Sequence, residues 1–307
     1  MLIQYFLRVA FLCAVVIGSA FGAPSKNAME AMKQTDNEAY LTSQNIYKKE
    51  FGDVSVFVIS LGNFDAPFDK LIASNDKQSA FLQTMANDKG INHQNVVLLK
   101  GENFIALIDT GFTHTQDTLI KQLQKVGISH QDITHIIISH AHPDHIGGIL
   151  PHSTKIKKAN KGTNIFPNAK LLIDEIEYNF WIKSNNELAK NSLHSFGENK
   201  EFFSHSAPIL TTKQTKIGTI KAYGHTPGHT IFSIESAGEK LIFISDLVHY
   251  FKIQNANPAI AIQYDNDKAQ AVATREALWK KFKKDKAYKN ALFVGAHFPT
   301  FRPIELK

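Results

Sequence analysis

Four side chains that can bind metal ions fall within six residues near the middle of the 307-residue sequence. They are His140, His142, Asp144 and His145, and they directly follow an apolar run. Because side chains of an extended segment alternate between its two sides, His140 and His142 can point in the same direction. Neutral imidazole suits zinc and similar ions, and a carboxylate balances part of their charge. This spacing therefore predicts a metal site.

Three further residues are candidates to complete this site. Each stands in or beside a loop next to an apolar run, and such loops commonly carry functional residues. They are His229 in the segment Gly-His-Thr-Pro-Gly-His-Thr at 224–230, Asp246 after the run 241–245, and His297 after the run 291–295. His225, in the same segment as His229, is expected to support a neighbouring group rather than to bind metal.

The order of these motifs resembles that of the metallo-β-lactamase superfamily. His-x-His-x-Asp-His with Gly-Gly behind it is followed by Gly-His-Thr-Pro-Gly-His-Thr, Ser-Asp and a late His, and Asp-Thr-Gly at 109–111 is similar to an early turn of the family. The resemblance runs from about Val54 to Ile304. It implies an α/β (α+β) fold, the four-layer αβ/βα sandwich, in which two mixed β-sheets are flanked by helices and metals lie at one edge.

The resemblance also implies the cofactors and the role of each ligand. Two divalent metal ions are expected, with zinc first and manganese, cobalt or iron compatible with the same ligands. A hydroxide bridging the metals would attack an ester-like bond, because paired cations lower the pKa of bound water. Asp144 and Asp246 are therefore the candidate catalytic carboxylates. The implied ligand sets are His140, His142 and His229 for the first metal, Asp144, His145 and His297 for the second, and Asp246 between them.

The branch of the superfamily is less constrained, because one fold hosts many chemistries. The segments after Asp246 and around His297 resemble the methyl parathion hydrolase group, whose relatives include N-acyl homoserine lactonases. This implies an exported hydrolase of lactones or phosphotriesters. A β-lactam hydrolase of the same fold and a mononuclear-iron persulfide dioxygenase are the alternatives. A β-lactamase with a cysteine ligand is excluded, since the only cysteine, Cys13, lies in an expected leader.

A small-molecule substrate is expected, and three residues are candidates to line its pocket. Trp181 lies in a helical pattern, Phe196 in the loop behind it, and His249 three residues after Asp246. Lactonases of the superfamily often use a tyrosine to assist the leaving group. Whether His249 or Tyr250 takes that role here is left open.

The elements that must position these residues are predicted by the hydrophobic pattern. Nine apolar runs are typical of strands, and they cover residues 54–61, 96–99, 104–108, 134–139, 169–173, 216–222, 231–235, 241–245 and 291–295. Three longer segments have helical periodicity, and they cover residues 118–126, 175–188 and 267–282. Strand clusters with helices between them indicate α/β or α+β layering. No strong linker interrupts the pattern, so we expect one hydrolase domain over residues 51–307.

The N-terminal residues are typical of a secretory leader. Arg8 precedes an apolar run from Val9 to Ile17, and small residues follow as far as Ala23. The run is short for a bilayer crossing. We expect a signal peptide over residues 1–23, a flexible segment over 24–50, and a periplasmic or secreted protein without a stable membrane anchor after cleavage.

The composition is that of a globular protein with a modest positive charge. Hydrophobic residues make up 43% of the chain, and the net charge is +6. The lysines between residues 280 and 286 are expected to form a solvated helix face. We therefore expect no nucleic-acid partner, and a homodimer is left open.

Overall fold

The structure, a computed structural model, describes residues 37–152 and 163–306. Contacts divide the chain into two units, residues 1–40 and 41–307. Of the first unit only residues 37–40 are described, and they begin a helix that covers residues 37–43. The expected signal peptide, including Cys13, lies outside the described residues. The second unit carries every candidate site residue.

A seven-stranded mixed sheet forms one half of the second unit, in the order β1-β2-β4-β5-β6-β7-β8. Its strands are β1 (Ile46–Phe51), β2 (Val54–Asp65), β4 (Ile91–Lys100), β5 (Ile105–Ile108), β6 (His135–Ile137), β7 (Lys170–Ile173) and β8 (Lys200–Phe202). Neighbours pair antiparallel from β1 to β5 and parallel from β5 to β8. Side chains of β2 alternate, so Val56 and Val58 face one core and Phe57 and Ile59 another.

A six-stranded sheet forms the other half, in the order β15-β14-β12-β11-β10-β9. Its strands are β9 (Leu210–Thr211), β10 (Thr215–Lys221), β11 (Thr230–Ser236), β12 (Glu239–Phe243), β14 (Leu292–Val294) and β15 (Ile304–Glu305). Only β12 and β14 pair in parallel. Phe232 and Ile234 of β11 pack in the same core as Val56 and Val58, so the two sheets enclose one apolar layer.

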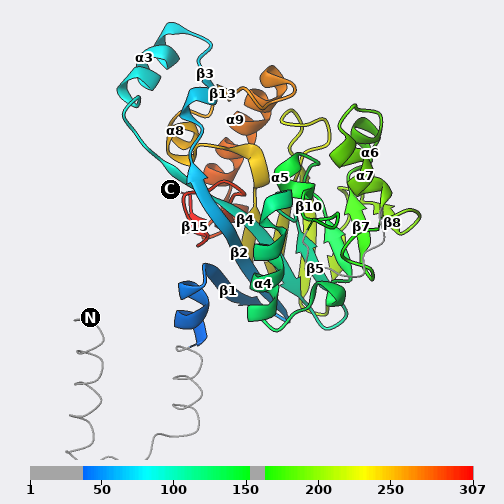
Figure 1. Cartoon of the computed structure of the whole chain (residues 1–307). Coiled ribbons are helices and arrows are strands. Elements are labelled where there is room, and N and C mark those ends of the chain that lie inside the picture. Colours follow the sequence, from blue (N-terminus) through cyan, green and yellow to red (C-terminus); the bar gives the residue numbers. More distant parts are fainter. Residues whose placement is uncertain (1–36, 153–162, 307) are drawn as a thin grey trace, which may run out of the picture. The chain divides into compact units, whose positions relative to one another are not determined.

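Helices cover the outer faces of both sheets (Figure 1). On the seven-stranded sheet they are α4 (Gln116–Lys125), α6 (Glu175–Ile182) and α7 (Glu187–His194), and on the other sheet α9 (Lys268–Lys284). Leu119 of α4 and Leu193 of α7 pack on the first sheet, and Trp279 of α9 packs on the second. The expected four-layer arrangement of helix, sheet, sheet and helix is confirmed.

The connection between β2 and β4, residues 66–90, extends beyond the first sheet and lies next to the site. It contains α3 (Asp76–Thr84) and β3 (Leu71–Ile72), which pairs with β13 (Ala261–Ile262). Tyr250, at the start of α8 (Phe251–Ala256), packs among its apolar residues. Short elements complete the list: α5 (Pro143–Ile146), η1 (Phe68–Lys70), η2 (Thr113–Thr115), η3 (His130–Asp132), η4 (Ser245–Leu247) and η5 (Lys286–Tyr288).

The structure corrects two expectations about the elements. The helix predicted over 175–188 is two helices, because Asn186 caps α7 by accepting a hydrogen bond from the Ala189 N–H. The segment expected to be flexible over 24–50 ends in β1, whose residues Ile46 and Phe51 are buried against β2. The residues between Ile46 and Phe51 are mostly polar, so the hydrophobic pattern did not predict this edge strand. The domain therefore begins before residue 51.

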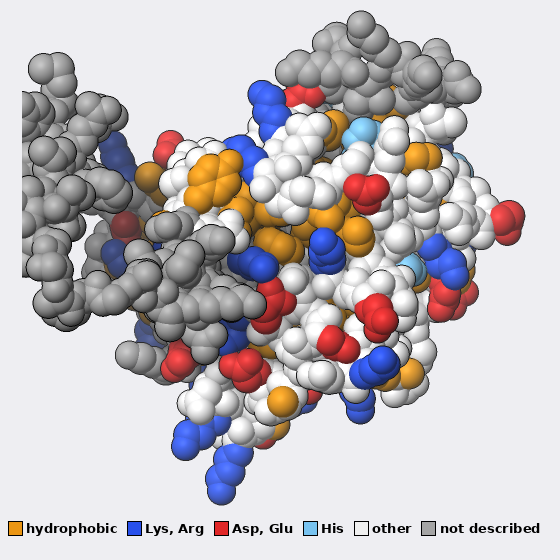
Figure 2. Space-filling model, turned by 90° about the horizontal axis from the view of Figure 1, so that it is seen from below, with side chains coloured by type: hydrophobic (Ala, Val, Ile, Leu, Met, Phe, Trp, Pro, Cys, Tyr) orange, Lys and Arg blue, Asp and Glu red, His pale blue; other side chains and the backbone are white. Residues whose placement is uncertain are grey.

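The exposed face seen in Figure 2 carries Lys and Arg side chains interspersed with Asp and Glu side chains. No helix within the described ranges is both long enough and apolar enough to cross a membrane.

Strand direction gathers the candidate residues at one edge. β5, β6 and β7 are parallel, so their carboxyl ends meet, and Asp109 and His140 follow two of these ends. β12 and β14 are also parallel, and Asp246 and His297 follow their ends. Crevices at the carboxyl ends of parallel strands are the usual ligand sites of such sheets.

Candidate metal centre

Seven side chains from the loops at this edge form two groups that share one carboxylate. Within each group, the potential ligand atoms all lie within 4.8 Å of one another. The first group is His140, His142, His225 and Asp246, and the second is Asp144, His145, Asp246 and His297. The expected pairing of His140 with His142, and of Asp144 with His145 and His297, is the one that the structure brings together.

A tight turn presents the first four of these residues. The chain leaves β6 extended through His142, and Pro143 then begins the short helix α5, with Asp144 in its first turn. Gly148 lies so close to the neighbouring loop that an added Cβ would be 2.3 Å from the Thr110 carbonyl oxygen. The Gly at this position therefore allows α5 to pack against the turn that follows β5.

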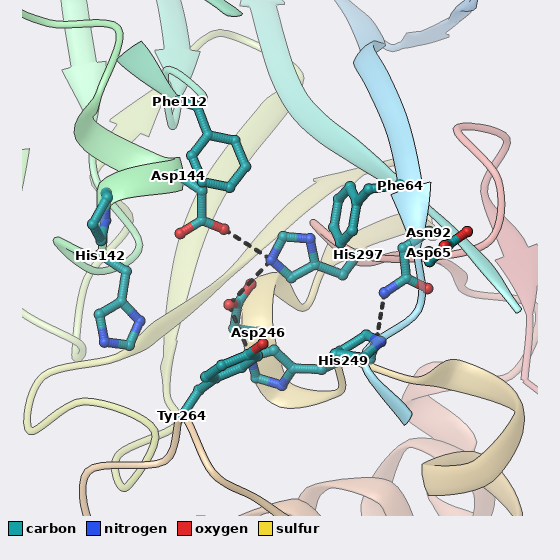
Figure 3. Close-up of a pocket in the computed structure, with 12 residues that line it drawn as sticks. Phe64, Asp65, Asn92, Phe112, His142, Asp144, Asp246, His249, Tyr264 and His297 are labelled. Carbon is teal, nitrogen blue, oxygen red and sulfur yellow. Dashed lines mark hydrogen bonds and ion pairs between the residues drawn. The ribbon is translucent and has the colours of Figure 1, made fainter. Parts of the chain in front are cut away.

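Asp246 lies between the two groups and is only 3% exposed. Its Oδ1 atom is 3.3 Å from His145 Nε2, and its Oδ2 atom is 3.3 Å from His297 Nε2 and 3.4 Å from His225 Nε2. Figure 3 shows that the carboxylates of Asp246 and Asp144 both approach the same ring nitrogen of His297. This is the position that a carboxylate shared between two cations requires.

The structure corrects the choice of histidine in the segment 224–230. His225 Nε2 is 3.2 Å from His140 Nε2 and belongs to the first group. His229 belongs to neither group, because both of its ring nitrogens are already bonded. Nδ1 donates to the Ala222 carbonyl oxygen at 3.0 Å, and Nε2 accepts from the Asp246 N–H at 3.2 Å. The structure therefore places His225, and not the predicted His229, in the first group.

Asp109 supports the second group more directly than a turn residue would. Its Oδ2 atom accepts from His145 Nδ1 at 2.8 Å and from the Ser139 hydroxyl at 2.7 Å. Its backbone φ is 61°, a left-handed conformation that Asp tolerates better than most residues. A carboxylate on the far nitrogen of a histidine fixes that ring and strengthens it as a metal ligand.

His225 has a similar partner on its far side. Its Nδ1 atom lies 3.0 Å from Asp265 Oδ1, and the Arg275 guanidinium lies 3.6 Å from the other oxygen of Asp265. Arg275 is 1% exposed although it is one of the longest side chains in the protein. The ion pair therefore lies inside the protein, where it holds Asp265 against His225.

The buried carboxylates shape the titration of the cluster. Burial disfavours the imidazolium form, but Asp246, Asp144 and Asp109 together raise the pKa of His145 well above its usual value. His297 is buried as well, but Asp246 and Asp144 raise its pKa to about 10. Burial, together with the neighbouring His225, lowers the pKa of His142 to about 3 against the opposing effect of Asp144 and Asp246. Positive charge is thus favoured beside Asp246, which is where a cation would bind.

Two observations show that the residues fit divalent metal ions. Among the described residues, neither His145 Nε2 nor Asp246 Oδ1 has a hydrogen-bond partner, although both atoms are buried. The histidines also contact four carboxylates, balanced by Arg275 alone, so neutral imidazoles leave an excess of three negative charges. Buried uncompensated charge is costly, and metal binding offsets it.

A cavity of about 460 Å³ opens onto the second group. Its polar wall includes Asp144, Asp246 and His297, and its apolar wall includes Phe64 and Phe112 (Figure 3). The complete lining is Phe64, Asp65, Pro67, Asn92, Phe112, His142, Pro143, Asp144, Asp246, His249, Tyr264 and His297.

Of the three residues predicted to line the pocket, only His249 does so. Its Nε2 atom is 3.1 Å from Asp246 Oδ2. Phe196 is 5% exposed and packs in the core under the seven-stranded sheet. Trp181 is buried in that core too, but its ring lies edge-on to His142 at 5.5 Å. Tyr250 turns away from the cavity, and its hydroxyl donates to the Asp88 carbonyl oxygen.

Most of the apolar wall was not predicted. Phe64 ends β2, Phe112 follows the turn after β5, and Tyr264 lies beyond β13. Only Phe112 carries a sequence signal, because it directly follows the Asp-Thr-Gly turn. The others come from segments that the fold alone brings together.

Comparison with known proteins agrees with this geometry. A model of the metallo-β-lactamase superfamily matches residues 90–154. The solved structure of AidC, a dizinc quorum-quenching lactonase in complex with a product, is 27% identical with a TM-score of 0.68, over 83% of this chain and 91% of that one. The chain therefore has the metallo-β-lactamase fold, and its residues 90–154 carry the match to the superfamily. A second neighbour, the hydrolase AbOPH of the β-lactamase superfamily, is 22% identical with the same TM-score over 85% and 92% of the chains, and it supports the fold alone.

Curated relatives match over shorter stretches. Metallo-β-lactamase domain-containing protein 1 of Xenopus laevis is 30% identical over 86 residues, which cover 28% of this chain and 29% of the relative. The uncharacterized protein YobT of Bacillus subtilis (strain 168) is 27% identical over 144 residues, which cover 45% and 55%. The chain thus spans less than two thirds of either relative. The metallo-β-lactamase fold and the hydrolases among its structural neighbours support the expected enzyme class, a metal-dependent hydrolase.

Removal of metal is expected to destabilise this protein. A metal ion that binds only the folded state raises the free energy of unfolding. When the free metal concentration is about 100 times the dissociation constant, the increase is about 2.7 kcal/mol. For a domain of this size that corresponds to roughly 5–10 °C in Tm. Thermal melts with a chelator and with added zinc would measure the shift. Identical melts under both conditions would contradict a metal centre in these two groups.

Proposed function

We propose that the chain is a dinuclear metal-dependent lactonase that hydrolyses N-acyl homoserine lactones. The observation that carries this proposal is the opening of the two-group cluster onto a partly apolar cavity. The AidC structure, at 27% identity, is that of a dizinc quorum-quenching lactonase with N-hexanoyl-L-homoserine bound. The proposal extends that activity to this chain.

The cavity favours a neutral substrate with an apolar tail. Among its described lining residues none is Lys or Arg, and three are Asp. Apart from the proposed metal ions and the histidines, an anionic substrate would therefore find no Lys or Arg partner in this wall. Phe64, Phe112 and Tyr264 offer an aromatic surface for an acyl chain. Its volume of about 460 Å³ is in the range of sites for such molecules.

The chain's own residues divide the work of ester hydrolysis. Two bound divalent ions would supply Lewis acidity and an activated water. Asp246 and the two histidine sets would hold them. Asp144 is the more exposed of the two carboxylates, with a side chain 16% accessible, so it is the one that can meet substrate. His249, on the cavity wall and next to Asp246, can donate a hydrogen bond to a substrate oxygen.

Two alternatives fit the cavity less well, and one fits it equally. β-Lactam antibiotics carry a carboxylate, for which the described lining residues include no Lys or Arg. A mononuclear persulfide dioxygenase would use only the first group, whereas both groups are complete here. Phosphotriesters, suggested by the resemblance to the methyl parathion hydrolase group, are neutral and remain the second candidate.

The proposal is tested by assaying the zinc-loaded protein on three substrate classes. We expect N-acyl homoserine lactones to be hydrolysed with the highest kcat/KM, phosphotriesters more slowly, and a cephalosporin least. A preference for the phosphotriester would replace the lactonase assignment with the second candidate. One iron per chain with persulfide oxidation would overturn both.

Phe112→Ala is expected to weaken binding of long acyl chains. Loss of an aromatic surface of this kind should raise KM for a decanoyl lactone by about tenfold, since burial of such a side chain contributes roughly 1.5–3 kcal/mol. An acetyl lactone should be affected little. Steady-state kinetics of Phe112→Ala and Phe112→Leu on both lactones would measure this. Equal changes for both chain lengths would remove Phe112 from the acyl site.

We also propose that the protein acts outside the cytoplasm. The support is the leader-like pattern before Ala23, which lies outside the described residues. N-terminal sequencing of the protein from its native cell should begin near residue 23 or 24. An intact Met1 on soluble protein inside the cell would contradict export.

A further inference from the structure

One buried carboxylate outside both groups connects the loops that carry the first group. Glu177 of α6 is 0% exposed. Its Oε1 atom accepts from the Ala141 N–H at 2.9 Å and from Trp181 Nε1 at 2.6 Å. Its Oε2 atom accepts from the Thr226 hydroxyl at 2.7 Å and from the Gly228 N–H at 2.8 Å. All four contacts are donors to an acceptor-only group.

Three of the four donors stand next to a histidine of the first group. Ala141 lies between His140 and His142, and Thr226 directly follows His225. The Trp181 ring packs edge-on against His142. The 139–142 segment leaves the seven-stranded sheet, and the 224–228 segment leaves the six-stranded sheet. One carboxylate therefore ties together ligand loops that belong to different halves of the fold.

The start of α6 is itself held firmly against the second loop. Asp174 caps the helix by accepting from the Ile176 and Glu177 N–H groups, and its other oxygen accepts from the Tyr223 hydroxyl at 2.8 Å. A Cβ added to Gly228 would lie 2.4 Å from the Glu177 backbone nitrogen. This close approach leaves Glu177 little room to move.

We propose that Glu177 is a positioning residue for the first metal subsite. By binding both loops, it holds His140, His142 and His225 close enough to share one metal ion. The inference rests on the proposed two-metal centre. Glu177 neither lines the cavity nor belongs to either ligand group, so its effect passes through the two loops. The second subsite has a separate support, because Asp109 bonds His145. Asp109 reaches His140 of the first group only indirectly, through the Ser139 hydroxyl. Its main effect is therefore expected on the second metal.

Chelator-competition titrations with zinc test this through the two stepwise dissociation constants. In Glu177→Gln the amide group must face two of the donors, so the hydrogen bonds of one oxygen are lost. We expect one binding step to weaken by about 10- to 100-fold while the other is unchanged. Asp109→Asn should weaken the other step, and the double variant should weaken both.

Ile234→Ala is the matched control for a general loss of stability. Ile234 is fully buried between the sheets, away from the ligand loops, so its truncation destabilises the fold without touching them. Both binding steps should stay at wild-type values in this variant. Thr226→Val removes a single donor and keeps the shape of the side chain. It should weaken the same step as Glu177→Gln by about tenfold or less, which keeps the test open if Glu177→Gln does not fold.

The possible failures are distinguishable. If Glu177→Gln and Thr226→Val leave both steps unchanged, or if Glu177→Gln and Asp109→Asn weaken the same step, the positioning role is wrong. If Ile234→Ala reproduces the effect, Glu177 acts only through stability, and the role is again wrong. If the wild-type protein binds fewer than two zinc ions, the two-metal proposal fails first.

Discussion

Asp246→Ala is expected to lower turnover by at least about 100-fold and to release at least one metal ion. Removal of residues that merely support a ligand costs about 10- to 100-fold, and Asp246 contacts both groups directly. Without its charge, two cations held a few ångströms apart would repel one another with less compensation. Metal analysis, Tm and kcat/KM of the purified variant would measure all three effects.

Two variants serve as controls for Asp246→Ala. Asp246→Asn keeps the shape but removes the charge, so it should lose metal almost as strongly. Asp109→Ala removes a carboxylate that contacts only the second group, through His145, and that also bonds Ser139. Loss of the bonds to Ser139 should lower stability, and loss of the His145 contact should weaken the binding of one metal. Asp246→Ala with two metals and near-normal turnover would refute the shared carboxylate.

His225→Ala and His229→Ala are expected to differ sharply although both histidines lie in one short motif. His225→Ala removes a member of the first group, so we expect about one metal per chain and at least about a 100-fold loss of turnover. His229→Ala removes two hydrogen bonds of a buried ring, to Ala222 and to the Asp246 N–H. Its main effect should be a loss of about 1–3 kcal/mol in the free energy of unfolding.

The burial of His229 supports this distinction. Burial is the main reason that the pKa of His229 is lowered to about 3, so its ring stays neutral and can both donate and accept. In contrast, hydrogen bonds to Asp246 and Asp265 raise the pKa of His225 to about 9 despite its burial. Metal stoichiometry and chemical denaturation of both variants decide the matter. If His229→Ala loses a metal while His225→Ala keeps two, the ligand expected from the sequence is correct after all.

The sequence alone was sufficient for most of the ligand set and for the class of fold. His140, His142, Asp144 and His145 are close in the chain, so a single local turn dictates that they share one site. Asp246 and His297 each follow an apolar strand, and the carboxyl ends of parallel strands meet at one edge. Local spacing and strand direction are properties that the order of residues already contains.

Tertiary structure alone decided which histidine of the 224–230 loop faces the cluster. His225 and His229 have similar neighbours in the chain, and the loop's path is set by contacts with α6, through Glu177, and with the 222 carbonyl. The cavity wall has the same origin, since Phe64 and Tyr264 are 200 residues apart in the sequence. Trp181 and Phe196 were predicted to line the pocket but lie in the core. An aromatic residue gives the same sequence signal in both places. Burial and ring direction depend on long-range packing, which no local pattern encodes.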